Sequence, residues 1–247
     1  MSRWKASAFH LLISLAIVGS IAAWLVGFWY PPALMHMANA DKLLMLIAGV
    51  DLVIGPLLTL IIYRHDKPGV KTDLMIIGLL QTGFLVYGLH SIVLSRPVFI
   101  VASVNRFDMV FANEMRPERL AAGSAPAYRS LGFTAPRIVG AIVPADPKEA
   151  QNITMSALSG QGDLETMPRY YVDYSRVAAQ MLAASYPLAY SKLTSRTEID
   201  RIFAAARDYG KSPDTVRWLH LASSRGLAVM LIDARTGAVI GPVNADP

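Results

Sequence analysis

The chain has 247 residues, 53% of them hydrophobic, and a mean hydropathy of +0.39. This composition excludes an ordinary soluble domain, in which the apolar fraction is lower. The formal net charge is +5, but the positive residues of the second half are dispersed among acidic ones and form no basic stripe, which argues against nucleic-acid binding. The chain contains no cysteine, so disulfides, thiolate nucleophiles and cysteine metal sites are excluded.

Three apolar segments dominate the first hundred residues. Residues 9–30, 43–63 and 74–94 each have the length of about 20 residues that a helix needs to cross a bilayer. Because lipid offers no hydrogen bonds to the backbone, each segment is expected to be helical. Only ten Lys, Arg, Asp or Glu residues precede Arg96. The sequence therefore predicts a three-helix transmembrane domain over residues 1–95 and a separate folded domain over residues 96–247.

The short loops predict how these spans are oriented. Basic residues precede the first span and join the second to the third: Arg3, Lys5, Arg64, Lys67 and Lys71. Between the first two spans only Lys42 occurs, beside Asp41. Because basic loops stay in the cytoplasm, we expect a cytoplasmic amino terminus and, after three spans, a domain outside the cytoplasm, which in a Gram-negative cell means an inner-membrane protein with a periplasmic domain.

The first span could instead be a secretory signal peptide, since Ala38-Asn39-Ala40 resembles a cleavage site. The apolar stretch is longer than the 7–15 residues of a signal core, and the Ala-x-Ala sequence lies well beyond its end. We therefore interpret the first span as an uncleaved membrane helix.

The domain after the membrane alternates strand and helix patterns. Stretches rich in β-branched and aromatic residues predict strands at residues 98–103, 107–111, 138–143, 215–222, 227–233 and 238–243. Helical periodicity predicts helices at 146–158, 173–184 and 197–209, the last with Thr194 or Ser195 as its cap and Gly210 as its stop. Residues 123–136 are predicted to form a loop. The fold class expected is a membrane protein with a three-transmembrane-helix bundle followed by an α+β domain with a mainly antiparallel sheet.

Known catalytic patterns are missing from the sequence. Gly210-Lys211-Ser212 resembles the end of a phosphate-binding loop, but Ala205 stands where that motif requires glycine, so a helix terminus explains it better. His220 is the only histidine after residue 95, and no two histidines have the spacing of metal ligands. The run of residues 169–174 is either an aromatic docking surface or a set of core aromatics. We expect no enzyme activity, no cofactor and no metal.

The informative polar residues lie within the spans. Asp51 is about eight residues into the second span, where a carboxylate needs a partner or a proton, so it is a functional-site hypothesis by default. Pro56 removes a backbone donor and releases the carbonyl of Leu52, while Gly55 permits close helix approach. By depth, Gln81 and Tyr87 of the third span lie level with this region. We predict that at least one of them contacts Asp51 or the freed Leu52 carbonyl.

Small residues recur every four positions on the first span, at Gly19, Ala23 and Gly27. Such a seam lets another helix pack closely, either a neighbour in the same chain or a partner. The polar cluster has the same two interpretations: it holds the three helices together, or it receives another transmembrane helix.

These features resemble the TfpX/TfpZ family of type IV pilin accessory proteins, also called fimbrial assembly proteins. The resemblance rests on motifs in the membrane half: Arg3-Trp4-Lys5-Ala6, Trp29-Tyr30-Pro31, the run from Gly49 to Leu60 that contains Asp51 and Pro56, Lys71-x-Asp73-Leu74, Gln81, Tyr87-Gly88, Arg96-Pro97 and Arg106-Phe107. In the later domain the similarity is mainly in layout and in the final hairpin.

The resemblance implies a non-enzymatic factor that assists the assembly, or the extension and retraction, of one major type IV pilin. Its expected partners are the membrane, that pilin and, as a second candidate, the pilus assembly platform. A pilin shares the layout of a hydrophobic helix and a periplasmic head. Two other hypotheses compete: a membrane-anchored periplasmic ligand-binding or sensor protein, and a membrane enzyme using Asp51.

Overall fold

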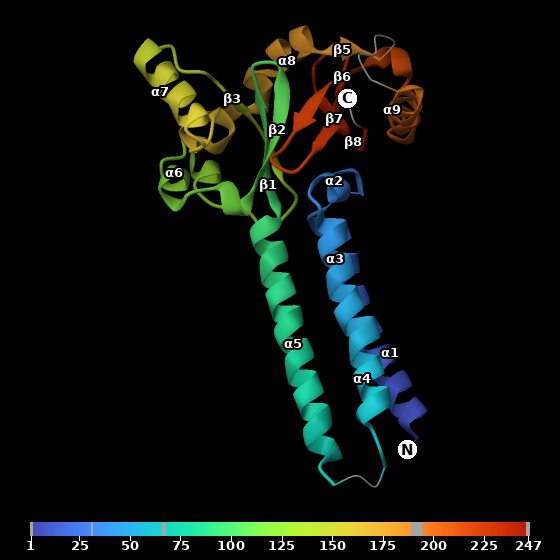
Figure 1. Cartoon of the computed structure of the whole chain (residues 1–247). Coiled ribbons are helices and arrows are strands. Elements are labelled where there is room, and N and C mark those ends of the chain that lie inside the picture. The colour runs from blue at the N-terminus through green and yellow to red at the C-terminus, as the bar shows by residue number, and fades with distance from the viewer. Residues whose placement is uncertain (1, 31, 66–67, 189–194, 246–247) are drawn as a thin grey trace. The chain divides into compact units, whose positions relative to one another are not determined.

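The computed structural model describes residues 2–30, 32–65, 68–188 and 195–245 (Figure 1). The chain divides into two compact units. The helical unit consists of Met1–Phe28 and Asn39–Ser95, and the sheet unit consists of Trp29–Ala38 and Arg96–Pro247. Three long apolar helices followed by an α+β region confirm the predicted fold class.

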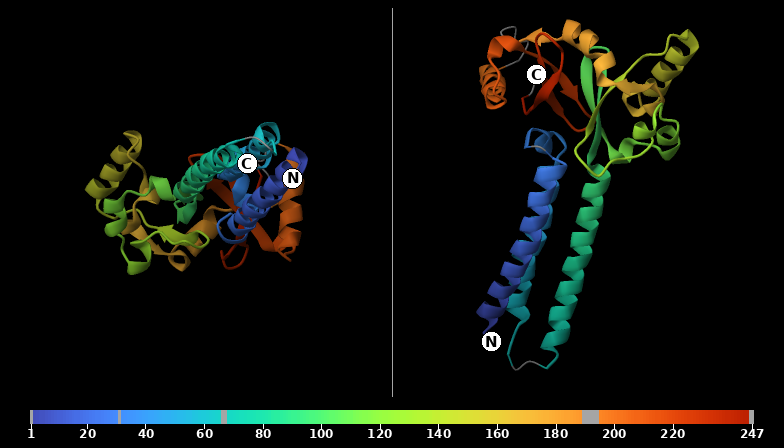
Figure 2. Two further views of the ribbon diagram at one scale, coloured as in Figure 1. Left: turned by 90° about the horizontal axis from the view of Figure 1, so that it is seen from below. Right: turned by 180° about the vertical axis from the view of Figure 1, so that it is seen from behind.

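The helical unit is built around its second span. The first span is α1 (Arg3–Phe28) and the third is α5 (Val70–Ser95). The second span runs continuously through α3 (Ala40–Ala48), a π-helical segment (Gly49–Ile54) and α4 (Gly55–Ile62). Helix α1 packs mainly against α4 and the π-helical segment, whereas α5 packs against α3 and α4 (Figure 2).

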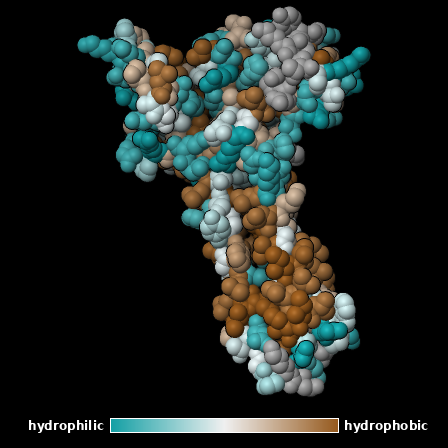
Figure 3. Space-filling model, viewed as in Figure 1, coloured by the Kyte–Doolittle hydropathy of each residue, from teal (hydrophilic) through white to brown (hydrophobic). Residues whose placement is uncertain are grey.

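All three helices are long and apolar enough to cross a membrane. Their outward faces carry exposed apolar side chains, which form the brown surface of the helical unit in Figure 3. The helices begin several residues before the predicted spans, and α1 ends two residues earlier than expected, at Phe28.

Eight strands of the described residues form one mixed sheet with the order β4-β3-β1-β2-β6-β7-β8, and β5 pairs with β6. The strands are β1 (Pro97–Ser103), β2 (Arg106–Phe111), β3 (Arg137–Ala141), β4 (Tyr171–Asp173), β5 (Tyr186–Pro187), β6 (Val216–Ala222), β7 (Leu227–Asp233) and β8 (Val239–Val243). Strand β1 runs parallel to β3, and β2 runs parallel to β6. The other pairs are antiparallel, including the β1–β2 and β7–β8 hairpins.

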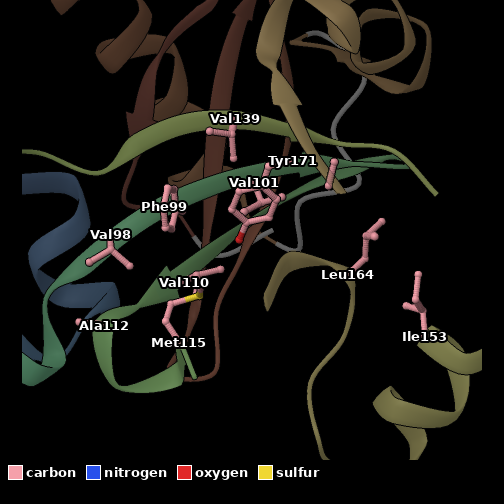
Figure 4. Close-up of a cluster of buried hydrophobic side chains, with 11 residues drawn as sticks. Val98, Phe99, Val101, Val110, Ala112, Met115, Val139, Ile153, Leu164 and Tyr171 are labelled. Atoms are coloured by element: carbon pink, nitrogen blue, oxygen red, sulfur yellow. The ribbon is translucent and has the colours of Figure 1, made fainter. Parts of the chain in front are cut away.

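Within the described residues, two hydrophobic clusters pack on the sheet. In the first, Phe99 on β1 meets Tyr171 on β4 edge to face, with 5.2 Å between the ring centroids (Figure 4). In the second, Trp218 of β6 is fully buried against α9 and β7 residues such as Ile202 and Leu231. Tyr171 therefore belongs to the core, which supports the packing interpretation of residues 169–174.

The helices of the sheet unit are α6 (Pro117–Ala121), α7 (Pro147–Leu158), α8 (Ala178–Ala184) and α9 (Arg196–Asp208). Short 3₁₀ turns connect the elements: Ala112–Glu114, Pro126–Tyr128, Leu164–Thr166, Pro168–Tyr170, Tyr174–Arg176 and Pro213–Thr215. Asp146 caps α7. Ser195, one of the two predicted caps, caps α9, and the alternative cap Thr194 lies outside the described residues.

The helix predicted over residues 173–184 is wrong in its first turn. Asp173 ends strand β4, and its side chain accepts a hydrogen bond from the Ser175 amide at 2.9 Å. This local bond stabilises a turn in place of a helix, so α8 begins only at Ala178.

The connection between the first two spans also differs from expectation. Trp29 and Tyr30 fall within the predicted first span, residues 9–30, but both are only 1% exposed and belong to the sheet unit, followed by the short helix α2 (Pro32–Met37). The Trp29 indole donates to the Phe133 carbonyl at 2.5 Å, and the Arg96 guanidinium lies 4.6 Å from the Phe133 ring centroid. The first connection is therefore part of the sheet unit.

Candidate functional site

The π-helical segment of the second span contains Asp51. Proline has no amide hydrogen, so Pro56 cannot donate to Leu52, and the helix widens just before it. In the widened turn the Gly55 amide donates to the carbonyl of Val50, five residues earlier. Widened turns of this kind are frequent at functional sites. Asp51 lies at the middle of the span Ala40–Ile62 and is only 5% exposed.

Gln81 of α5 reaches Asp51. Its Nε2 atom lies 3.4 Å from the Asp51 Oδ1 atom and 3.5 Å from the Asp51 carbonyl oxygen. The approach depends on Gly55, because a Cβ atom at that position would collide with the Nε2, Cδ and Oε1 atoms of Gln81. Depth along the spans predicted Gln81 level with Pro56, and the structure brings Gln81 against both Asp51 and Gly55.

Helix α1 adds polar contacts that sequence reasoning missed. His10 Nδ1 lies 2.6 Å from Thr59 Oγ1, and the Ser7 hydroxyl donates to the Pro56 carbonyl at 2.8 Å. Ser14 is buried on the same face. The signal that could have revealed this face is the spacing of Ser7, His10 and Ser14, which are three and four residues apart and so share one side of a helix.

A pocket of about 190 Å³ lies between α1 and α5, with Asp51 among its lining residues. We call it the Asp51 groove, and its lining residues are His10, Ile13, Ser14, Ile17, Val18, Asp51, Gly78, Gln81, Thr82 and Leu85. The Asp51 Oδ2 atom is buried and has no hydrogen-bond partner among the residues that the structure describes. One carboxylate oxygen thus accepts a hydrogen bond from Gln81, and the other has no donor among the described residues.

Comparison with known proteins finds relatives from Dichelobacter nodosus. Fimbrial assembly protein, serogroup I, is 26% identical over 232 residues, which are 92% of this chain and 89% of the relative. Fimbrial assembly protein, serogroup E1, is 25% identical over the same extent. Fimbrial assembly protein, serogroups C1 and C2, is 34% identical over 99 residues, which are 39% of this chain and 76% of that relative.

The chain belongs to the fimbrial assembly protein family. No family model matches it, and no solved structure matches it. The similarity to the longer fimbrial assembly proteins extends over nearly the whole chain, whereas the sequence motifs above lie mainly in the membrane half.

Other residues singled out in the sequence do not join the Asp51 groove. Tyr87 is 70% exposed, and its carbonyl accepts a hydrogen bond from Ser91. The seam residues Gly19, Ala23 and Gly27 are exposed, and a Cβ atom on either glycine would meet nothing within 4 Å. The seam is therefore not used for packing within the helical unit.

The sheet unit has a charged cleft that the sequence analysis did not predict. It has a volume of about 560 Å³ and includes Arg106, Asp108 and Glu165 in its lining. Arg106 Nε donates to both oxygens of Asp108, at 2.9 and 3.0 Å. Burial raises the pKa of Asp108 above its usual value, and the hydrogen bond from Arg106 opposes this shift. Burial likewise raises the pKa of Glu165.

The described residues include no group of three or more His, Cys, Asp or Glu side chains that could hold a metal ion. His220 lies on β6 with its ring centroid 5.3 Å from that of Trp218. Its surroundings are those of a histidine packed among aromatic rings.

Proposed function

We propose that this protein is a TfpX/TfpZ-type accessory factor that assists the assembly, or the extension and retraction, of a specific major type IV pilin. The observation that carries the proposal is the similarity, across 92% of the chain, to a relative named as a fimbrial assembly protein. The proposed role is non-enzymatic, with the polar groups of the Asp51 groove serving contacts between helices.

We place the protein in the bacterial inner membrane with its amino terminus in the cytoplasm and its sheet unit in the periplasm. The basic residues before α1 and between the second and third spans support this orientation. The burial of Trp29 and Tyr30 in the sheet unit supports a common location for the first connection and the domain.

The two units suit a partner that is itself a membrane helix with a folded head. In this proposal the helical unit meets the pilin helix and the sheet unit meets the pilin head. Two weak contacts on one chain raise the effective concentration of each, so neither contact has to be tight.

The test is deletion of the gene, followed by counting surface pili by electron microscopy and by a twitching assay. We expect the deletion strain to lose most surface pili and to recover them with the full chain, but not with a chain that ends at Ser95. Normal piliation and twitching in the deletion strain would contradict the proposal. That outcome would favour a ligand-binding role for the cleft around Arg106 and Asp108.

A further inference from the structure

We infer that the Asp51 groove is the docking site for the transmembrane helix of the served pilin, and that this helix donates a hydrogen bond to the Asp51 Oδ2 atom. The identity of the partner depends on the function proposed above. The site itself is argued from the helical unit alone.

The first step concerns the carboxylate. Asp51 is 95% buried by the other residues of the chain, and its Oδ2 atom has no donor within the described residues. A buried acceptor at the middle of a membrane span is costly unless something donates to it. Because Gln81 already contacts the Oδ1 atom, the Oδ2 atom is the oxygen that still lacks a donor.

The second step concerns access. The pocket lies between α1 and α5, which pack mainly on the second span. Its rim includes Ile13 and Ile17 on α1, which are 46% and 43% exposed, and Thr82 on α5, which is also exposed. Residues in the middle of all three spans line the pocket, so it is reached from within the bilayer.

The third step concerns the size and shape of the occupant. A volume of about 190 Å³ is too small for a helix and suits one inserted side chain, with the helix itself lying along the rim. Gly78 lines the pocket, and a Cβ atom on it would meet nothing within 4 Å, so a partner backbone can approach α5 closely there. Thr82 continues this small face one turn later.

The alternative sites on the helices are weaker. Around α1, Gly19, Ala23 and Gly27 lie about 180°, 140° and 100° from His10, so the seam is centred away from the groove. Its three residues carry no polar side chain. The Asp51 groove combines small residues with an acceptor that lacks a donor, which favours a helix that presents a hydrogen-bond donor at this depth.

The test uses a photoreactive amino acid placed in the full chain, in cells that make pili, with antibodies against the pilin to detect adducts. Ile17 is the groove position. Leu15 is its matched control, because it is 53% exposed and lies about 200° around the same helix at nearly the same depth. We expect pilin adducts from position 17 and few from position 15.

Variants of Asp51 then test the acceptor. Asp51→Leu removes both oxygens and is expected to reduce the adduct from position 17 by about tenfold, the ratio that corresponds to one hydrogen bond to a charged group. Asp51→Asn presents an acceptor oxygen to the groove when the Gln81 amide turns to accept from the new NH₂ group, and is expected to retain more of the adduct than Asp51→Leu. Normal protease resistance of both variants confirms that they fold.

Equal adducts from positions 15 and 17, or an unchanged adduct in Asp51→Leu, would overturn the docking site. An equal loss in Asp51→Asn and Asp51→Leu would overturn the acceptor role of the oxygen. The proposed function is judged separately: a deletion strain without pili, combined with no adduct at position 17, rejects the groove and leaves the accessory role standing.

Discussion

For individual residues around Asp51, the sequence predicted the depth along each span but not the direction in which the side chain points. Counting residues along each span placed Gln81 and Tyr87 near the level of this site, and Gln81 does contact Asp51, at 3.4 Å. Tyr87 instead points away and is 70% exposed. The two residues are about 120° apart around α5, and only the packing of α5 on the second span decides which of them faces Asp51.

At Gly55 the close approach of Gln81 leaves no room for a methyl group. Gly55→Ala is therefore expected to displace Gln81 and to lower the free energy of unfolding by about 1–3 kcal/mol through overpacking. Gly19→Ala is the control, because nothing lies within 4 Å of its Cβ position; it is expected to be neutral or stabilising by about 0.5–1 kcal/mol. The free energies of unfolding of the two variants are measured in mixed detergent micelles, with circular dichroism as the readout. Equal effects would contradict the packing described.

Asp108 predicts a pH dependence of stability. Its pKa in the folded state is raised above the ordinary value of 3.8 by burial, so the folded state binds its proton more tightly than the unfolded state does. The free energy of unfolding therefore falls as the pH rises from below 3.8 through the raised pKa, by at most about 1.4 kcal/mol per pH unit. Below pH 3.8 this contribution is fully present.

Asp108→Asn removes this titration and is expected to flatten the stability curve of the full chain over the same interval. Asp173 and Asp233, whose pKa values are lowered by hydrogen bonds, act in the opposite direction. Asp173 and Asp233 are present in both the unchanged chain and the Asp108→Asn variant. The difference between the stability curves of these two proteins therefore isolates the contribution of Asp108. Parallel curves would show that Asp108 does not contribute.

At the scale of elements, the structure differs most from the sequence prediction where contacts between residues far apart in the sequence determine where a segment packs. The end of the first span has amphipathic aromatic rings, which are typical of a membrane interface. In the structure, Trp29 and Tyr30 leave the span and enter the core of the sheet unit. The partners that bury them, such as Phe133 and Arg96, are far away in the sequence.

Trp29→Ala is expected to destabilise the sheet unit by about 3–5 kcal/mol, because it leaves a cavity and deprives the Phe133 carbonyl of its donor. Trp24→Ala is the control: Trp24 is 43% exposed on α1 in the helical unit. Hydrogen exchange of β1 and β3, measured by mass spectrometry on the full chain, reports the effect. If both variants exchange alike, the connection does not stabilise the sheet.

At the scale of the whole molecule, the proposed orientation has a direct test, and the absence of cysteine makes it simple. One cysteine is introduced as Leu158→Cys, because Leu158 is 77% exposed in the sheet unit. The other is introduced as His65→Cys, because His65 is exposed just after the second span. A membrane-impermeant maleimide is expected to label position 158 in intact spheroplasts and position 65 only after lysis. The reverse pattern would contradict a periplasmic sheet unit.

The sequence by itself determined the three membrane helices, the α+β class of the domain and its hairpins. These features follow from hydrophobic length and from alternation along the chain, which are local properties. The tertiary structure alone decided that Trp29–Ala38 joins the sheet unit, that β1 and β3 run parallel, and that His10 and Ser7 face the second span. These features depend on how helices rotate and which strands meet, and those choices are made by contacts between residues distant in the chain.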